Sequence, residues 1–141
     1  MAAPGLFPPA QQLADFMASR RVFHLHLVSD ATGETLNAVA RAACAQYEDA
    51  HPIEHVYALV RGPKQLERVL GEIEGAPGIV MFTMVNDELR QRLEARCAEL
   101  QTPCISVLDP VMGALGTYLG RESSHKPGSQ HTMNAEYFGR I

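Results

Sequence analysis

The sequence contains few cysteines, no tryptophan and no long apolar run. Cys44, Cys97 and Cys104 are odd in number and form no C-x-x-C pair. This pattern argues against a disulfide framework and against a structural zinc site. The three cysteines fit reduced thiols, so we expect a cytoplasmic protein.

Apolar runs of membrane length and an excess of basic residues are also missing. No segment approaches the roughly 18 apolar residues that a membrane span requires, and residues 1–9 lack the basic and apolar regions of a secretory signal. The 12 Lys and Arg residues are outnumbered by 16 Asp and Glu residues, which gives a formal net charge of -4. This balance argues against a general nucleic-acid-binding surface. We therefore expect neither a membrane nor a nucleic acid as partner.

Three motifs of nucleotide and hydrolase chemistry are absent as well. The glycine-containing loop near residue 33 is not G-x-G-x-x-G, and G-x-x-x-x-G-K-[ST] occurs nowhere in the chain. A G-x-S-x-G nucleophile elbow is missing too. Spacing alone therefore supports neither dinucleotide binding, nor Walker-type binding, nor nucleophilic hydrolysis.

Apolar runs of strand length alternate with helical patterns along most of the chain. Such alternation implies right-handed β-α-β crossovers and a parallel sheet with both faces covered. We predict a doubly wound α/β fold, Rossmann-like or flavodoxin-like, with a mostly parallel four-stranded sheet and helices on both faces. The expected strands are residues 22–28, 55–60, 78–84 and 103–108, and the expected helices are residues 34–47, 63–74, 87–101 and a shorter one from Pro110.

The composition of the chain changes at two positions and suggests three parts. Residues 1–21 form an extension with Pro4, Pro8 and Pro9, followed by a short amphipathic helix over residues 10–20 that we expect to pack on the domain's flank. Residues 22–120 make up the α/β domain. Residues 121–141 form a polar loop that leads into another helix.

That last helix would carry Tyr137, Phe138 and Ile141 on one stripe. The stripe needs something to pack against and stops before completing a third turn. We therefore expect the sequence to be a fragment. An exposed stripe of this kind could also pair two copies into a homodimer.

The most informative stretch is residues 22–37, where an apolar strand stops abruptly in a turn that opens a helix. Gly33 can adopt dihedral angles that other residues resist, and the first N–H groups of the helix favour anions. The same loop carries four short polar side chains, which are Ser29, Asp30, Thr32 and Thr35. They could cap the helix, bind a phosphate-containing ligand, or do both.

The other loops at the carboxyl ends of the strands should lie at the same edge of the sheet. Ligands of doubly wound proteins bind at this edge. The loops offer a mixture of charged and polar side chains, which are Arg61, Lys64, Asn86, Asp87 and Asp109. Such a mixture suits a phosphorylated or nucleotide-like ligand.

The histidines do not predict a metal centre. His24 and His26 share one face of a strand that we expect to be buried on both sides, which favours core histidines with satisfied hydrogen bonds. His51 and His55 flank the expected start of the next strand and have no carboxylate or thiolate cluster at ligand-like spacing. We assign no metal ligand.

A polar segment near the end of the chain offers a second set of phosphate contacts. Around the Pro127–Gly128 turn it brings together hydroxyl groups, a cation and two imidazoles. The candidate ligand-binding residues here are Ser124, His125, Lys126, Ser129 and His131. The alternative is a solvated linker between domains.

Three stretches together resemble one family. They are LVSDATGETL after the first expected strand, DPVM after the fourth, and SHKPGSQHTMNAEYFGRI at the end. In order and composition they resemble the regulatory proteins of pyruvate, phosphate dikinase and phosphoenolpyruvate synthetase. The resemblance covers residues 22–141, and its last motif is the most specific.

The resemblance implies a bifunctional serine/threonine kinase and pyrophosphorylase. Such an enzyme phosphorylates a threonine of its target synthase with ADP as donor, and removes that phosphate with inorganic phosphate, releasing pyrophosphate. Positioning and charge neutralisation, with a divalent metal, would carry both reactions. The implied partner is pyruvate, phosphate dikinase or phosphoenolpyruvate synthetase.

The sequence departs from that family in length. Its members are nearly twice as long and keep a glycine-and-lysine P-loop in the half that follows the position of Ile141. The resemblance therefore implies that the missing half binds most of the ADP and phosphate, and that this chain alone catalyses neither reaction. Two hypotheses remain: one wall of an active site, with Asp30 or Asp109 as proton acceptor, or a module that docks the target or binds a phosphate ligand without catalysis.

Overall fold

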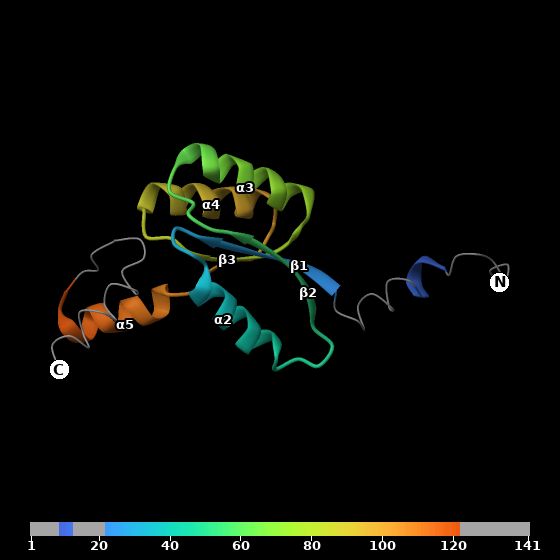
Figure 1. Cartoon of the computed structure of the whole chain (residues 1–141), viewed down its shortest axis with the longest axis horizontal. Helices are drawn as coiled ribbons and strands as arrows, with labels where there is room; N and C mark the ends of the chain where they lie inside the picture. Colours follow the sequence, from blue (N-terminus) through green and yellow to red (C-terminus); the bar gives the residue numbers. More distant parts are fainter. Residues whose placement is uncertain (1–8, 13–21, 122–141) are drawn as a thin grey trace.

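The computed structural model describes residues 9–12 and 22–121 (Figure 1). Only residues 10–12 of the helix expected over residues 10–20 lie in this part, and they are helical. The expected polar loop and terminal helix beyond residue 121 lie outside the described residues.

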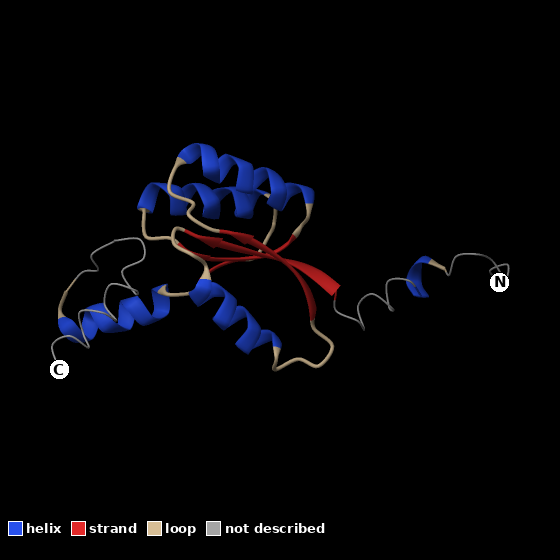
Figure 2. Cartoon of the chain, in the orientation of Figure 1, coloured by secondary structure: helices blue, strands red, loops and turns tan. Residues whose placement is uncertain are grey.

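The predicted fold is confirmed. Four strands form one parallel sheet in the order β2-β1-β3-β4. Figure 2 shows α3 and α4 on one face of the sheet and α2 on the other. The strands are β1 (Val22–Ser29), β2 (His51–Tyr57), β3 (Gly78–Thr83) and β4 (Cys104–Ser106), and the helices are α2 (Glu34–Cys44), α3 (Pro63–Gly75), α4 (Asp87–Glu99) and α5 (Asp109–Leu119).

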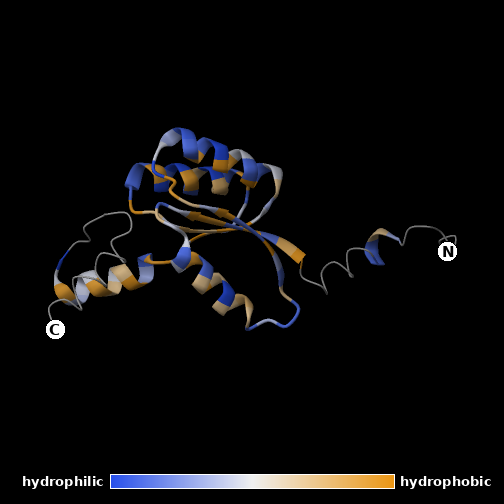
Figure 3. Cartoon of the chain, in the orientation of Figure 1, coloured by the Kyte–Doolittle hydropathy of each residue, from blue (hydrophilic) through white to orange (hydrophobic). Residues whose placement is uncertain are grey.

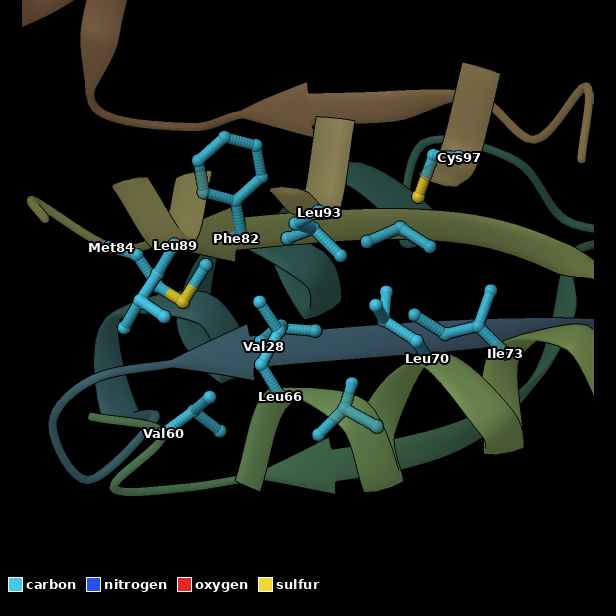
Figure 4. Packing of buried hydrophobic residues seen from close by; sticks show 12 residues of the cluster. Val28, Val60, Leu66, Leu70, Ile73, Phe82, Met84, Leu89, Leu93 and Cys97 are labelled. Atoms are coloured by element: carbon cyan, nitrogen blue, oxygen red, sulfur yellow. The ribbon is translucent and has the colours of Figure 1, made fainter. Parts of the chain in front are cut away.

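The larger apolar core lies between the sheet and the pair α3 and α4. Figure 4 shows its side chains converging from both layers. Phe82 of β3 and Leu93 of α4 are fully buried, and full burial of such a side chain contributes about 1.5–3 kcal/mol. The buried members are Val28, Val60, Leu66, Val69, Leu70, Ile73, Val80, Phe82, Met84, Leu89, Leu93 and Cys97. Figure 3 shows hydrophilic residues on the outer sides of these helices.

The core on the α2 face is smaller. Its fully or nearly fully buried members are Leu25, Leu27, Leu36 and Ala40. α5 contributes no buried residue, and Val111, Leu115, Tyr118 and Leu119 are exposed along it. One face of the sheet is therefore well covered and the other only in part.

The expected bounds of β2 were wrong. The strand begins at His51 instead of residue 55 and ends at Tyr57 instead of residue 60. Pairing with β1 fixes the register, with Val22 opposite His51, and Pro52 is tolerated because β2 is an edge strand. Leu59, with a φ of 58°, then turns the chain out of the sheet.

The ends of several other elements also differ from expectation. α2 stops at Cys44, α4 stops at Glu99, and β4 has only three residues. α5 begins at Asp109, one residue earlier than expected. Apart from the three-residue difference at the end of α2, these shifts are of the size by which helix and strand ends vary between definitions.

Candidate functional site

The candidate site lies at the carboxyl edge of the sheet, between β1 and β3. The chain leaves β1 through α2 toward β2, and it leaves β3 through α4 toward β4 on the other side. Adjacent strands whose connections run in opposite directions open a crevice, and doubly wound proteins bind ligands there. Asp30 follows directly after β1 at this position.

Asp30 bridges the crevice. Its backbone N–H donates to the carbonyl oxygen of Thr83 at 3.3 Å, and its Oδ2 accepts from the N–H of Val85 at 3.0 Å. The side chain is only 6% exposed. Burial raises the pKa of Asp30 above its usual range, although the Val85 hydrogen bond and the Arg61 charge oppose this shift. A carboxyl group of this kind holds a proton more readily than an exposed aspartate does.

Hydroxyl groups lie beside Asp30. The Thr83 hydroxyl donates to Ser29 Oγ at 3.2 Å, and Ser29 Oγ also accepts from the N–H of Ala31 at 3.0 Å. Both Ser29 and Thr83 are buried. This buried network ties β1 to β3 and fixes the backbone that presents Asp30.

Arg61 supplies the cation of the crevice. Its Nε donates to the carbonyl oxygen of Asp30 at 2.7 Å, and its own N–H is held by Gln65 Oε1 at 2.8 Å. The loop that carries it is bonded along the end of β1, where Val60 N–H donates to Ser29 O. An exposed guanidinium beside a buried carboxyl suits the recognition of a phosphate group.

Gly33 forms the N-cap of α2 in a left-handed conformation, with a φ of 89°. A Cβ at this position would lie 3.3 Å from Val56 Cγ1 on β2. No side chain caps the helix, and Thr32 Oγ1 lies at a long 3.5 Å from the N–H of Glu34. The sequence left helix capping and ligand binding open as roles for this loop, and side-chain capping therefore has little support. Thr35 lies half-buried in the first turn of α2.

Asp109 lies at the start of α5 and pairs with Arg90 of α4. Burial alone would raise the pKa of Asp109, but hydrogen bonds from Arg90 and Ser106 together lower it below its usual range. The Arg90 guanidinium also lies 5.4 Å from the centre of the Phe82 ring. An ionised, arginine-bound carboxylate is a weaker base than Asp30, so Asp30 is the better candidate for a proton acceptor.

The remaining expected residues have other roles or positions. Asn86 is used as the N-cap of α4, where its Oδ1 accepts from the N–H of Leu89 at 3.0 Å. Lys64 lies in the first turn of α3 and is exposed. The segment with Ser124, His125, Lys126, Ser129 and His131 lies outside the described residues.

The histidines form a cluster on the α3 face. His26 is buried, with Nε2 2.7 Å from the Ala76 carbonyl oxygen and Nδ1 2.9 Å from the Tyr57 hydroxyl, as expected for a satisfied core histidine. His24 is half-buried and contacts His55 at 2.9 Å. Across residues 9–12 and 22–121, no group of three or more His, Cys, Asp or Glu could hold a metal ion.

Sequence comparison assigns the chain to a family. The kinase/pyrophosphorylase family matches residues 25–141, and the chain belongs to it. Relatives in Afipia carboxidovorans, Caulobacter vibrioides and Rhodopseudomonas palustris (strain TIE-1) are 56%, 57% and 59% identical over 123, 119 and 119 residues. Each of these three bears the name pyruvate, phosphate dikinase regulatory protein. The resemblance noted in the sequence is thereby confirmed.

The match covers most of this chain but less than half of each relative. It spans 87%, 84% and 84% of the chain, but 44%, 38% and 43% of those three proteins. The chain therefore spans about two fifths of the length of the relatives it matches. Within the described residues, no helix is long and apolar enough to cross a membrane.

Proposed function

We propose that this chain supplies one wall of the active site of a bifunctional serine/threonine kinase and pyrophosphorylase. In one direction a threonine hydroxyl of the target attacks the terminal phosphoryl group of ADP, which yields phosphothreonine and AMP and releases a proton. In the other direction inorganic phosphate attacks phosphothreonine, which restores threonine and yields pyrophosphate. The target is pyruvate, phosphate dikinase or phosphoenolpyruvate synthetase, and the names of the relatives favour the dikinase.

The buried carboxyl of Asp30 is the observation that carries this proposal. A group that accepts the proton of the threonine hydroxyl works best when its pKa is raised toward neutrality, and burial has this effect on Asp30. Arg61 hydrogen-bonds to the Asp30 carbonyl oxygen and so places a positive charge beside the loop that follows β1. This charge would stabilise a phosphoryl group in the crevice. Gly33 and the N-terminus of α2 would add backbone N–H groups.

Most of the nucleotide binding would come from residues that this chain does not contain. The single positive charge of Arg61 cannot neutralise the phosphates of ADP together with inorganic phosphate, and an ionised Asp30 would add a negative charge. A divalent metal would supply the remaining charge neutralisation, together with the half of the protein that the longer relatives carry. We therefore expect this chain alone to transfer no phosphate from ADP to the target threonine.

Calorimetric titration of the chain with ADP, AMP, phosphate and pyrophosphate tests the ligand role of the crevice. Weak binding of phosphate or pyrophosphate that is lost in Arg61→Gln would support it. Lys64→Gln is the matched control, because Lys64 is an exposed cation on the first turn of α3. Equal loss in both variants, or no heat with any of the four compounds, would contradict the ligand role.

Asp30→Asn in the intact regulatory protein tests the catalytic role. The variant keeps an oxygen to accept from Val85 N–H but loses the group that accepts a proton. We expect turnover to fall about 10²–10⁴-fold, the usual contribution of general base catalysis, with target binding unchanged. Glu34→Gln, an exposed carboxylate four residues away, should keep full turnover. Unchanged turnover in Asp30→Asn would rule out this role for the carboxyl group.

A docking function for the same edge is the second candidate, and one observation favours it. Leu59 is 51% exposed next to the crevice, where its N–H is bonded to the Ala31 carbonyl oxygen. An exposed leucine in a fixed conformation suits contact with a protein partner better than contact with a phosphate. If docking is the only function, Leu59→Ser should lower target affinity and Asp30→Asn should do the same.

A further inference from the structure

The histidine cluster, made of His24, His26, His55 and Tyr57, joins the edge strand β2 to β1. His24 Nδ1 lies 2.9 Å from His55 Nε2, and His26 Nδ1 lies 2.9 Å from the Tyr57 hydroxyl. The rings of His26 and His55 stack with their centres 4.7 Å apart. Each of these contacts runs from one strand to the other.

The attachment of β2 to the sheet depends on this cluster. β2 lies at the edge of the sheet and pairs with β1, and all its residues are exposed or half-buried. On the face toward α3, His51 and Ile53 are exposed, so the half-buried His55 and Tyr57 supply the side-chain contacts. A strand with so few buried contacts opens at a low free energy. Apart from the backbone hydrogen bonds, β2 is thus held on this face by contacts with imidazoles.

The hydrogen bonds of His26 show where its proton lies. The Ala76 carbonyl oxygen can only accept, so Nε2 carries the hydrogen in their 2.7 Å contact. In the neutral ring Nδ1 must then accept, and the Tyr57 hydroxyl donates to it. A protonated His26 would present an N–H to Tyr57 instead. The hydroxyl would then have to donate to Glu72 of α3, the other acceptor within its reach.

The contact between His24 and His55 accepts one extra proton but not two. One ring donates and the other accepts, and this remains possible when the donor is charged. A second proton would set two N–H groups against each other. A charge on His55 would also lie against the stacked ring of His26, and like charges at this distance repel each other. Protonation of the cluster therefore pushes β2 away from β1.

We propose that the histidine cluster is a pH-sensitive switch, which keeps β2 on β1 while His26 is neutral and lets residues 51–57 open when His26 takes up a proton. The negative charge of Glu72 favours the proton, whereas burial and the two neighbouring imidazoles oppose it. The titratable groups that face His26 are His24 on β1, His55 and Tyr57 on β2, and Glu72 on α3.

The direction of the pH effect follows from the surroundings of His26. Burial has the largest effect and lowers the pKa of His26, and His55 and His24 lower it further. The hydrogen bond to Ala76 and the charge of Glu72 act in the opposite direction without reversing the shift. In an opened strand the ring would be in water, where the pKa of histidine is about 6.5. The open form therefore binds the proton more tightly, and acid favours opening.

The end of β2 that leads to the crevice is held independently of the cluster. Leu59 N–H donates to the Ala31 carbonyl oxygen and Val60 N–H donates to that of Ser29, both at 2.9 Å. Val60 is also buried in the larger core. The opening is therefore confined to residues 51–57, and it does not depend on the phosphotransfer proposed above.

Hydrogen exchange followed by mass spectrometry tests the switch in the full 141-residue chain. It would be measured at about pH 7.5 and about pH 5.5, on either side of the ordinary pKa of histidine, and corrected for the intrinsic pH dependence of exchange. We expect the protection of residues 51–57 to fall about tenfold, because uptake of one proton on opening changes the equilibrium up to tenfold per pH unit. Residues 104–106 should keep their protection, because β4 is the other edge strand and contains no histidine.

Two variants separate the cluster from other effects of pH. His26→Gln removes the titrating ring, so the protection of residues 51–57 should become independent of pH, even if it is lower throughout. His51→Gln is the matched control, because His51 is an exposed histidine on the same face of β2, and it should keep the tenfold fall.

Nitrogen-15 NMR of the imidazoles in the parent chain adds a readout that needs no variant. Neutral His26 should be the Nε2–H tautomer, and its protonation should coincide with the loss of protection in residues 51–57.

Four outcomes would overturn the proposal. Unchanged protection of residues 51–57 would mean that the strand does not open, and equal losses in residues 51–57 and 104–106 would mean that acid unfolds the whole sheet. The parent's pH dependence in His26→Gln would assign the effect to other groups. An Nδ1–H tautomer of neutral His26 would contradict the hydrogen bonds on which the switch is based.

Discussion

Replacing Gly33 by alanine should destabilise the protein by about 1–2 kcal/mol. This is the cost of placing a residue with a Cβ in the left-handed conformation, and Gly33 has a φ of 89°. The new methyl group would also lie 3.3 Å from Val56 Cγ1, so β2 would have to move by a few tenths of an ångström. The backbone strain and the close contact with Val56 add, because β1 and α2 hold the loop on both sides.

Urea denaturation followed by circular dichroism measures this effect. With a slope of about 2 kcal/mol per molar urea, the midpoint should fall by roughly 0.5–1 M. Gly71→Ala is the matched control, because Gly71 lies inside α3 with nothing within 4 Å of the added methyl group. That variant should gain about 0.5–1 kcal/mol from higher helix propensity. If both variants shifted the midpoint in the same direction, the explanation from backbone conformation would be refuted.

Three further changes have definite expected outcomes. Gly78→Ala should cost about 3 kcal/mol or more in urea denaturation, because its Cβ would lie 2.0 Å from the His24 carbonyl oxygen; a small loss would contradict the strand spacing. Burial lowers the pKa of His26 below 6.5, which means that the folded protein favours the neutral imidazole. The contribution of neutral His26 to the free energy of unfolding is therefore complete above that pH and is lost as the pH falls through the folded-state pKa. Urea midpoints should therefore fall with acidity more steeply in the parent than in His26→Gln. Arg90→Met should raise the pKa of Asp109 in an NMR titration, and an unchanged value would show that the ion pair is absent in solution.

Local signals explain what the sequence could predict. The apolar residues of α3 recur with the helical period in the sequence, and they are buried, namely Leu66, Val69, Leu70 and Ile73. Pro63 begins this helix and Asn86 caps the next one, which follow from the chemistry of proline and of the amide side chain. The turn after β1 is predictable for the same reason, since Gly33 and the run of short polar residues allow few alternatives.

Contacts between residues far apart in the sequence explain which features the sequence could not predict. Thr83 and Arg90 were not among the candidates, because their importance depends on the order of the strands and on the ion pair that joins Arg90 of α4 to Asp109 of α5. The start of β2 was missed because His51 and Pro52 are poor strand residues, and only their pairing with β1 makes them part of the sheet.

The bonds that build the crevice join parts of the chain that are far apart in sequence. The hydrogen bond from Val85 to Asp30 connects residues 55 positions apart, and that between Thr83 and Ser29 connects residues 54 apart. Contacts between residues with such a large sequence separation form late in folding, because the intervening chain must first be ordered. During synthesis, Asp30 therefore leaves the ribosome long before its partners, and the site appears only when β3 joins β1. A chain interrupted before Gly78 would contain the entire first loop and still have no crevice.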